Sequence, residues 1–201
     1  MEEEDGVDEE CGLSAISGRI FGGVTFPQCE WPFSPMVSLR FFFPNYPDYT
    51  NGNLTLCAGA ILNNRTILTT AVCAGFINTF SANQQSTAAV VVGEYDTRTT
   101  DTDPANPAVV VEEMKLIAAV RIHPNYDRST LANNLAMLRL TSPIQYHRCK
   151  VPACMPDAAS SSDDCLQNDD TCMMAAWGTS SRKYWQDPLE TGGGGFKRGA
   201  E

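Results

Sequence analysis

Eight cysteines are the residues of this chain most able to do chemistry, and their spacing bears on the choice between metal binding and disulfide formation. They are Cys11, Cys29, Cys57, Cys73, Cys149, Cys154, Cys165 and Cys172. A zinc site usually needs closely paired thiolates or a cluster of histidines. This chain has no Cys-x-x-Cys pair and only two histidines, His123 and His147. We therefore expect disulfides, which indicate an oxidising, extracellular compartment.

Two Asn-x-Thr sequons agree with that compartment. They begin at Asn53 and Asn64 and are acceptor motifs for N-linked glycosylation. The first ten residues, MEEEDGVDEE, have neither the basic start nor the apolar stretch of a signal peptide. We expect that the true start lies upstream. The alternative is that the chain is one piece of a larger secreted protein.

The charge of the chain narrows the class of partner. A formal net charge of -10 disfavours nucleic acid and anionic membrane surfaces, because both would repel the protein. No apolar run approaches the roughly 20 residues needed to span a bilayer. With 201 residues and 43% hydrophobic content, the chain can bury a core as one domain or as two packed halves.

Short strands are the elements that must position these residues. Segments rich in Val, Ile, Phe and Thr predict strands at Met36–Phe43, Ala58–Leu62, Ile67–Ala71, Ala88–Val92, Val109–Ile122 with a break, Ala136–Leu140 and Cys172–Gly178. Turn-forming residues separate them, as in Pro44–Asn53 and Thr97–Pro107. No stretch has a sustained apolar period of 3.6 residues, so no helix is predicted. The pattern favours an all-β, antiparallel barrel or sandwich.

Several segments also match, in order, the motifs of one protein family. They are RIFGG at residues 19–23, WPFSPMVSL at 31–39, CAGAIL at 57–62, ILTTAVC at 67–73, VVGEYD at 91–96, IHPNYD at 122–127, NNLAMLRL at 133–140, VPACMP at 151–156 and CMMAAWG at 172–178. These resemble RIVGG, WPWQVSL, CGGSLI, LTAAHC, VxLGEHD, IHPNYD, NDIALLRL, VxPACLP and CxxxGWG of the trypsin/chymotrypsin-like serine proteases. The order of the matches makes chance an unsatisfactory explanation.

The resemblance implies a fold and a domain layout. The family's fold is two six-stranded antiparallel barrels with the active site between them. This chain is expected to supply the first barrel and only the opening strand of an incomplete second barrel. Residues 1–18 then form a polar, propeptide-like leader, and residues 19–186 a truncated peptidase domain. Residues 187–201, with Gly192 to Gly195, are expected to form a flexible tail.

Two catalytic positions of the family are occupied by residues of the wrong chemistry. Val72 stands where LTAAHC has the histidine that acts as general base, and it has no nitrogen that can accept a proton. Asn134 stands where NDIALLRL has the aspartate that orients this histidine. The family's GDSGGP segment, which carries the nucleophilic serine, is absent. Locally, we expect Val72 to be a core valine in a strand, Asn134 a satisfied turn or core amide, and both histidines to lie at the surface.

No catalytic residue is therefore expected. The resemblance implies a secreted serine protease homologue, a pseudoprotease that binds other proteins as a decoy, adaptor or cofactor of proteolytic cascades. Its partners would be active serine proteases or their substrates. The alternative is a truncated fragment of a trypsin-like serine endopeptidase whose full-length parent carries the second barrel.

The activation site of the family has a counterpart at Arg19 and Ile20. Cleavage after Arg19 would release an ammonium group on Ile20. In the family this charge pairs with an aspartate beside the catalytic serine, and that segment is missing here. An unpaired ammonium group should stay in water, so we expect a nick without activation.

The resemblance also implies part of the disulfide pattern. The family's bridges match Cys57–Cys73, and Cys11–Cys154 corresponds to the bridge that ties the propeptide to the catalytic domain. The remaining cysteines, Cys29, Cys149, Cys165 and Cys172, must pair among themselves, remain free or link to another chain.

A calcium site is the last feature that the resemblance raises. Some family members bind calcium in the loop that starts at the residue matching Glu94, and Asp96 and Glu112 are further candidate ligands here. The loop also carries Asp101 and Asp103, and Glu113 follows Glu112. Calcium needs six to eight oxygen ligands, whereas acidic surface loops are common in a chain of this charge. We favour a solvated loop and expect no cofactor.

Overall fold

The computed structural model describes residues 28–29, 35–42, 53–82, 87–97, 99–155, 175–178 and 192–195. Five residues of the predicted sites lie outside these ranges, namely Cys11, Arg19, Ile20, Cys165 and Cys172. No helix within the described ranges is long and apolar enough to cross a membrane.

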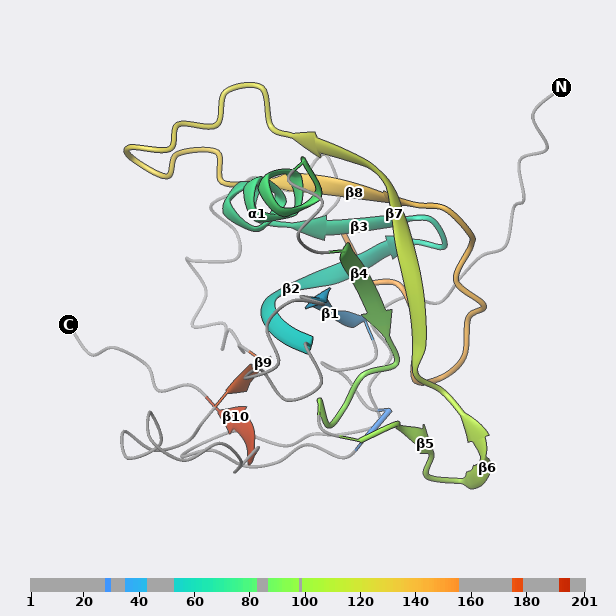
Figure 1. Ribbon diagram of the computed structural model, residues 1–201. Coiled ribbons are helices and arrows are strands. Elements are labelled where there is room, and N and C mark those ends of the chain that lie inside the picture. The colour runs from blue at the N-terminus through green and yellow to red at the C-terminus, as the bar shows by residue number, and fades with distance from the viewer. Residues whose placement is uncertain are drawn as a thin grey trace, which may run out of the picture.

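Six antiparallel strands close into a barrel in the order β1-β2-β3-β8-β7-β4. The strands are β1 (Met36–Phe42), β2 (Asn53–Asn63), β3 (Thr66–Thr69), β4 (Thr87–Val92), β7 (Glu113–Ile122) and β8 (Ala136–Leu140), and Figure 1 shows them wrapped around one interior. The prediction of an all-β, antiparallel barrel is confirmed. The predicted break in Val109–Ile122 is also confirmed, since β6 ends at Val110 and β7 starts at Glu113.

The barrel interior is filled by alternate residues of the strands. Along β8, Ala136, Leu138 and Leu140 are buried, whereas Met137 and Arg139 between them are exposed. This alternation follows from the two-residue period of a strand, which sends successive side chains to opposite faces. The core cluster is completed by the other fully buried apolar residues, among them Val37, Leu39, Phe41, Ile61, Ile67, Val90 and Val92.

The helix α1 (Ala71–Ala82) corrects the prediction in two respects. The strand expected at Ile67–Ala71 ends at Thr69, and Val72 lies in a helix rather than in a strand. Ala71, Ala74 and Ile77 are buried at helical spacing. The sequence AVCAGFINTF hides this period, because apolar residues also occupy the positions between them.

Two small two-stranded sheets lie outside the barrel. The strands β5 (Thr102–Asp103) and β6 (Asn106–Val110) form a hairpin. It starts within Thr97–Pro107, which was expected to be a turn, and ends in the segment predicted to be a strand from Val109. The strands β9 (Ala175–Gly178) and β10 (Gly192–Gly195) pair antiparallel. The sequence predicted that residues 187–201 form a flexible tail, whereas Gly192–Gly195 within them form β10. Glycine backbone still carries a donor and an acceptor at each residue, and pairing with β9 gives part of these groups a partner.

Candidate functional site

Val72 and Asn134, the two residues that the sequence resemblance aligns with a base and an aspartate, are joined by a hydrogen bond at the start of α1. The backbone N–H of Val72 donates a hydrogen bond to the side-chain oxygen of Asn134 at 3.1 Å. Thr70 Oγ1 accepts a second bond from the Cys73 N–H at 3.2 Å. The first N–H groups of a helix have no partner within the helix. Asn134 and Thr70 together therefore cap α1, and the side-chain oxygen of Asn134 has the hydrogen-bond partner that was expected for it.

The loop between β7 and β8 holds Asn134 in this position. Within it, His123 N donates to Leu135 O at 2.9 Å and Asp127 N donates to Ala132 O at 3.0 Å. The Asn133 side chain donates to Asn125 O at 3.0 Å. These bonds run across the loop and join its two sides. Figure 1 shows the loop (yellow) extending beyond the barrel on the side of α1.

Among the described residues, neither histidine side chain makes a hydrogen bond to Val72 or Asn134. His123 Nδ1 accepts a hydrogen bond from Asn125 N at 3.2 Å, which stabilises the turn that follows it. His147 Nε2 lies 3.2 Å from Asp103 Oδ2, in a separate cluster. Both histidines were expected at the surface, and both side chains are half-buried there. The Val72 side chain itself is half-buried and aliphatic.

A cluster of carboxylates lies beside the outer face of β1. Carboxylate oxygens of Glu94, Asp101 and Glu112 lie within 4.8 Å of one another. Arg40 on β1 enters the cluster, forming ion pairs with Glu94 and, at 3.2 Å, with Glu112 Oε1. Glu94 is 1% exposed and also accepts a hydrogen bond from Ser38 Oγ at 3.1 Å. No local sequence pattern marks Arg40 as a partner of these carboxylates, which it contacts only in the folded barrel.

Burial of this cluster changes its acid–base properties. Loss of water raises the pKa of Glu94 from 4.5 to about 7, against the opposing effect of the Arg40 charge. Burial also raises the pKa of Asp101, although hydrogen bonds from the Tyr95 and Asp96 backbone oppose the shift. Both carboxyl groups therefore hold their protons more strongly than exposed ones.

The arrangement does not fit a calcium ion. Asp101 Oδ2 accepts the N–H groups of Tyr95 and Asp96 at 2.6 and 3.0 Å, and Glu112 Oε2 accepts that of Asp101 at 3.2 Å. Glu94 and Glu112 also contact the Arg40 guanidinium, which would repel a second cation. A calcium ion needs six to eight oxygens. Of the predicted ligands, Asp96 takes part in this cluster through its backbone N–H.

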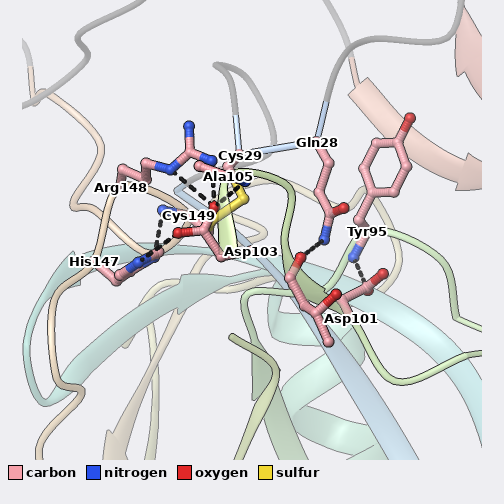
Figure 2. The surroundings of a disulfide bond; sticks show 10 residues. Gln28, Cys29, Tyr95, Asp101, Asp103, Ala105, His147, Arg148 and Cys149 are labelled. Atoms are coloured by element: carbon pink, nitrogen blue, oxygen red, sulfur yellow. Dashed lines mark hydrogen bonds and ion pairs between the residues drawn. A yellow bond between two sulfur atoms is a disulfide. The ribbon is translucent and has the colours of Figure 1, made fainter. Parts of the chain in front are cut away.

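The structure resolves a disulfide pairing that the sequence left open. Cys29 is bonded to Cys149, and Figure 2 shows Asp103 beside the bridge with Arg148 and His147 directed at its carboxylate. Hydrogen bonding from Arg148 lowers the pKa of Asp103. Gln28 donates from its side chain to Thr102 O at 2.9 Å. The bridge and these bonds attach residues 28–29 to the β5–β6 hairpin and to the turn at residues 147–150.

The other disulfide predictions have different outcomes. Cys57–Cys73 is confirmed and joins β2 to α1. Cys154 is disulfide-bonded. Its proposed partner Cys11 lies outside the described residues, so the pairing Cys11–Cys154 stays a prediction.

One contact ties β9 to the loop that follows β4. The Trp177 Nε1–H group donates to Tyr95 O at 3.0 Å. The backbone N–H of Tyr95 in turn donates to Asp101, so the carboxylate cluster and β9 share this residue. The strand expected to open the incomplete second barrel is β9. The bond from Trp177 thus attaches it to the segment that starts at Glu94.

Comparison with known proteins agrees with this geometry. The sequence model of the Trypsin family matches residues 20–192. The chain therefore belongs to the trypsin family of serine proteases.

Individual relatives match only part of their own length. The chain is 30% identical over 157 residues to CLIP domain-containing serine protease B9 of Anopheles gambiae, covering 73% of this chain and 35% of the relative. It is 31% identical over 170 residues to alkaline trypsin A of Manduca sexta, covering 83% and 54%. The chain thus spans between about a third and a half of these two curated relatives.

The solved structures include a similar fold. The crystal structure of Grass, a Drosophila clip serine protease of the Toll pathway, has a TM-score of 0.56 and 22% sequence identity. It covers 76% of this chain and 40% of that one. This likeness supports the trypsin-like barrel fold described above.

Proposed function

We propose that this protein is a catalytically inactive member of the trypsin family that acts by binding other proteins. The observation that carries the proposal is the contact between Val72 and Asn134 at the start of α1. The Val72 backbone N–H meets the Asn134 side-chain oxygen at the two positions where the family resemblance expects a base and the carboxylate that orients it. One side chain is aliphatic and the other is an amide engaged in capping the helix.

The chemistry of these two residues argues against hydrolysis. Valine cannot accept the proton of an attacking hydroxyl group. An amide in place of the carboxylate lowers turnover about 10⁴-fold in an enzyme that still has its histidine. The loss of a whole triad costs on the order of 10⁶ in turnover. His123 and His147 make other contacts, so neither is a candidate replacement base.

The surface around this pair favours a protein partner. Leu131 and Leu135 in the β7–β8 loop are 52% and 51% exposed, and Phe76 on α1 is 43% exposed. Leu131 also has a positive φ of 58°, which is uncommon for leucine and is maintained by the bonds across the loop. Contiguous exposed apolar patches mark protein interaction sites, and we propose that these three side chains contribute to one. The proposed partners are active serine proteases or their substrates, with the protein serving as decoy, adaptor or cofactor.

The proposal includes secretion and glycosylation. Two disulfides, Cys29–Cys149 and Cys57–Cys73, support an oxidising compartment. Cleavage after Arg19 is proposed to nick the chain without generating activity. No metal or organic cofactor is proposed.

The test combines an activity assay with a binding assay. The complete parent protein is cleaved at Arg19 and incubated with arginine and aromatic peptide esters, and turnover at least 10⁴-fold below that of trypsin is expected. In parallel, the 201-residue chain is immobilised and tested against purified trypsin-like proteases. Leu131→Asp should weaken capture at least tenfold. Met114→Asp, which changes a side chain 54% exposed on β7, should leave it unaltered.

A second candidate follows from the limited coverage of the relatives. The chain spans 35% of one relative and 54% of another, so it is alternatively a fragment of an active endopeptidase. Ester hydrolysis by the parent protein within a few hundredfold of trypsin would favour that alternative and reject the proposal of an inactive homologue.

A further inference from the structure

The turn between β2 and β3 carries one of the two sequons. β2 ends at Asn63 and β3 begins at Thr66, and these residues pair across the hairpin. Asn64 and Arg65 form the two-residue turn between them. The acceptor residue of the motif Asn64-Arg65-Thr66 therefore lies in the tight turn at the tip of a hairpin.

The side chain of Asn64 is available for modification. The residue is exposed, and its side-chain amide makes no hydrogen bond within the described part of the chain. The neighbouring Asn63 differs, because its Oδ1 accepts the Arg65 N–H at 2.9 Å. The Thr66 hydroxyl, which the motif requires, likewise has no partner among the described residues. The two groups that the sequon needs are thus not used to hold the fold together.

The backbone of the turn is well anchored. The Asn64 carbonyl accepts the N–H of Ile144 at 2.7 Å, and the Arg65 carbonyl accepts that of Leu140 at 2.9 Å. Arg65 Nη1 also donates to Thr141 O at 3.3 Å. The segment from Leu140 to Ile144 holds the turn by its main chain. Attachment of a sugar at the Asn64 amide would break none of these bonds.

The position of the turn separates it from the proposed binding site. β3 starts at Thr66 beside the turn and leads, through Thr70, into α1 and Val72. The turn and α1 therefore lie at opposite ends of β3. Figure 1 shows the β2–β3 turn on the opposite side of the barrel from α1. A glycan there would leave the surface around Val72 and Leu131 free.

We propose that Asn64 is an N-glycosylation site that accepts an oligosaccharide from a lipid-linked diphosphate donor. The Asn64 Nδ2 atom forms a bond to C1 of the first sugar and loses one proton. The bond between C1 and the diphosphate oxygen breaks, and the lipid diphosphate leaves with that electron pair. The inference rests on the proposed secretion but not on the proposed binding role.

The test uses the full chain behind a cleavable signal peptide in a eukaryotic secretory host. Peptide N-glycosidase should lower the mass of the secreted protein and convert Asn64 to Asp in its peptide. Asn64→Gln should abolish the modification at this position, whereas Thr66→Ser should retain it, since either hydroxyl satisfies the motif. Asn53→Gln, the change in the other sequon, should leave the Asn64 glycan in place.

Translation of the same variants in the presence of microsomes gives a readout that does not depend on folding or export. A wild-type chain that enters the microsomes with Asn64 unmodified, or that carries sugar only at Asn53, would overturn the proposal. Binding is measured separately, and Asn64→Gln should bind protease partners as the wild type does. Loss of partner binding in every variant would count against the binding role and leave the glycan result standing.

Discussion

The side-chain oxygen of Asn134 lies 3.1 Å from the backbone nitrogen of Val72 and accepts its hydrogen bond. This bond joins the β7–β8 loop to the first turn of α1. It shows that Asn134 has a structural role that requires only an acceptor oxygen. A carboxylate would serve the same role with an added negative charge near the helix N-terminus.

Substitution of Asn134 tests this capping role. Asn134→Ala removes the acceptor and should lower the free energy of unfolding by about 1 kcal/mol. Asn134→Asp keeps the acceptor and should leave stability equal or raise it by about 0.5 kcal/mol. Thermal unfolding followed by circular dichroism measures both changes, and the alanine variant should melt about 2–4 °C lower. Equal melting temperatures for all three proteins would show that the bond contributes nothing.

Two glycines should respond in opposite directions to the same substitution. Gly93 has a φ of +72°, and an added Cβ would lie 2.3 Å from the Val111 carbonyl oxygen. Gly93→Ala should therefore destabilise the protein by more than about 2 kcal/mol. Gly75 lies within α1, and an added Cβ there meets no atom within 4 Å. Gly75→Ala should stabilise the protein by up to about 1 kcal/mol. Chemical denaturation of the two variants, side by side, provides the measurement.

The raised pKa of Glu94 makes stability depend on pH. Its pKa of about 7 in the folded protein exceeds the ordinary 4.5, so the folded state retains a proton that the unfolded state releases. This contribution is fully present below pH 4.5 and is lost as the pH rises through about 7. Between pH 5 and 8 it should fall by up to about 3 kcal/mol.

Glu94→Gln removes the titrating group. The stability of this variant should therefore vary less than that of the wild type between pH 5 and 8. Glu113→Gln is the matched control, because ion pairing with Lys115 and Lys150 lowers the pKa of Glu113 despite its partial burial. The contribution of Glu113 is lost only as the pH falls below its ordinary range, so the control should keep the wild-type slope between pH 5 and 8. Urea titrations at four pH values in this window measure the free energy of unfolding of both variants and so distinguish them. A wild-type slope in Glu94→Gln contradicts the assignment.

Calcium should have no effect on the carboxylate cluster while Arg40 is present. The melting temperature of the wild type should be the same in millimolar calcium chloride and in a chelator. Arg40→Met removes the positive charge from between Glu94 and Glu112 and should lower the melting temperature by several degrees. Arg139→Met, which changes an exposed arginine on β8, is the control and should have little effect. A calcium-dependent rise in the wild type would show that the cluster binds the ion despite Arg40.

The barrel strands were predictable because their signal is local. Alternating burial along β8 follows from a two-residue pattern that is visible in the sequence AMLRL. The helix α1 was not predicted, because apolar residues also lie between Ala71, Ala74 and Ile77 and obscure their helical spacing. The prediction that Val72 lies in a strand failed with it. The motif match around Cys57 and Cys73, by contrast, placed that disulfide correctly.

The chain alone determined that position 72 has an aliphatic side chain, that position 134 has an amide, and that the strands alternate as a barrel requires. Only the tertiary structure decided that Asn134 caps the helix carrying Val72, that Cys29 pairs with Cys149, and that Arg40 lies among Glu94 and Glu112. Side-chain identity belongs to a single position, and the period of a strand can be read from adjacent residues. Contacts between residues 54 to 120 positions apart depend on how the barrel closes, and the physics of a single strand does not specify that closure.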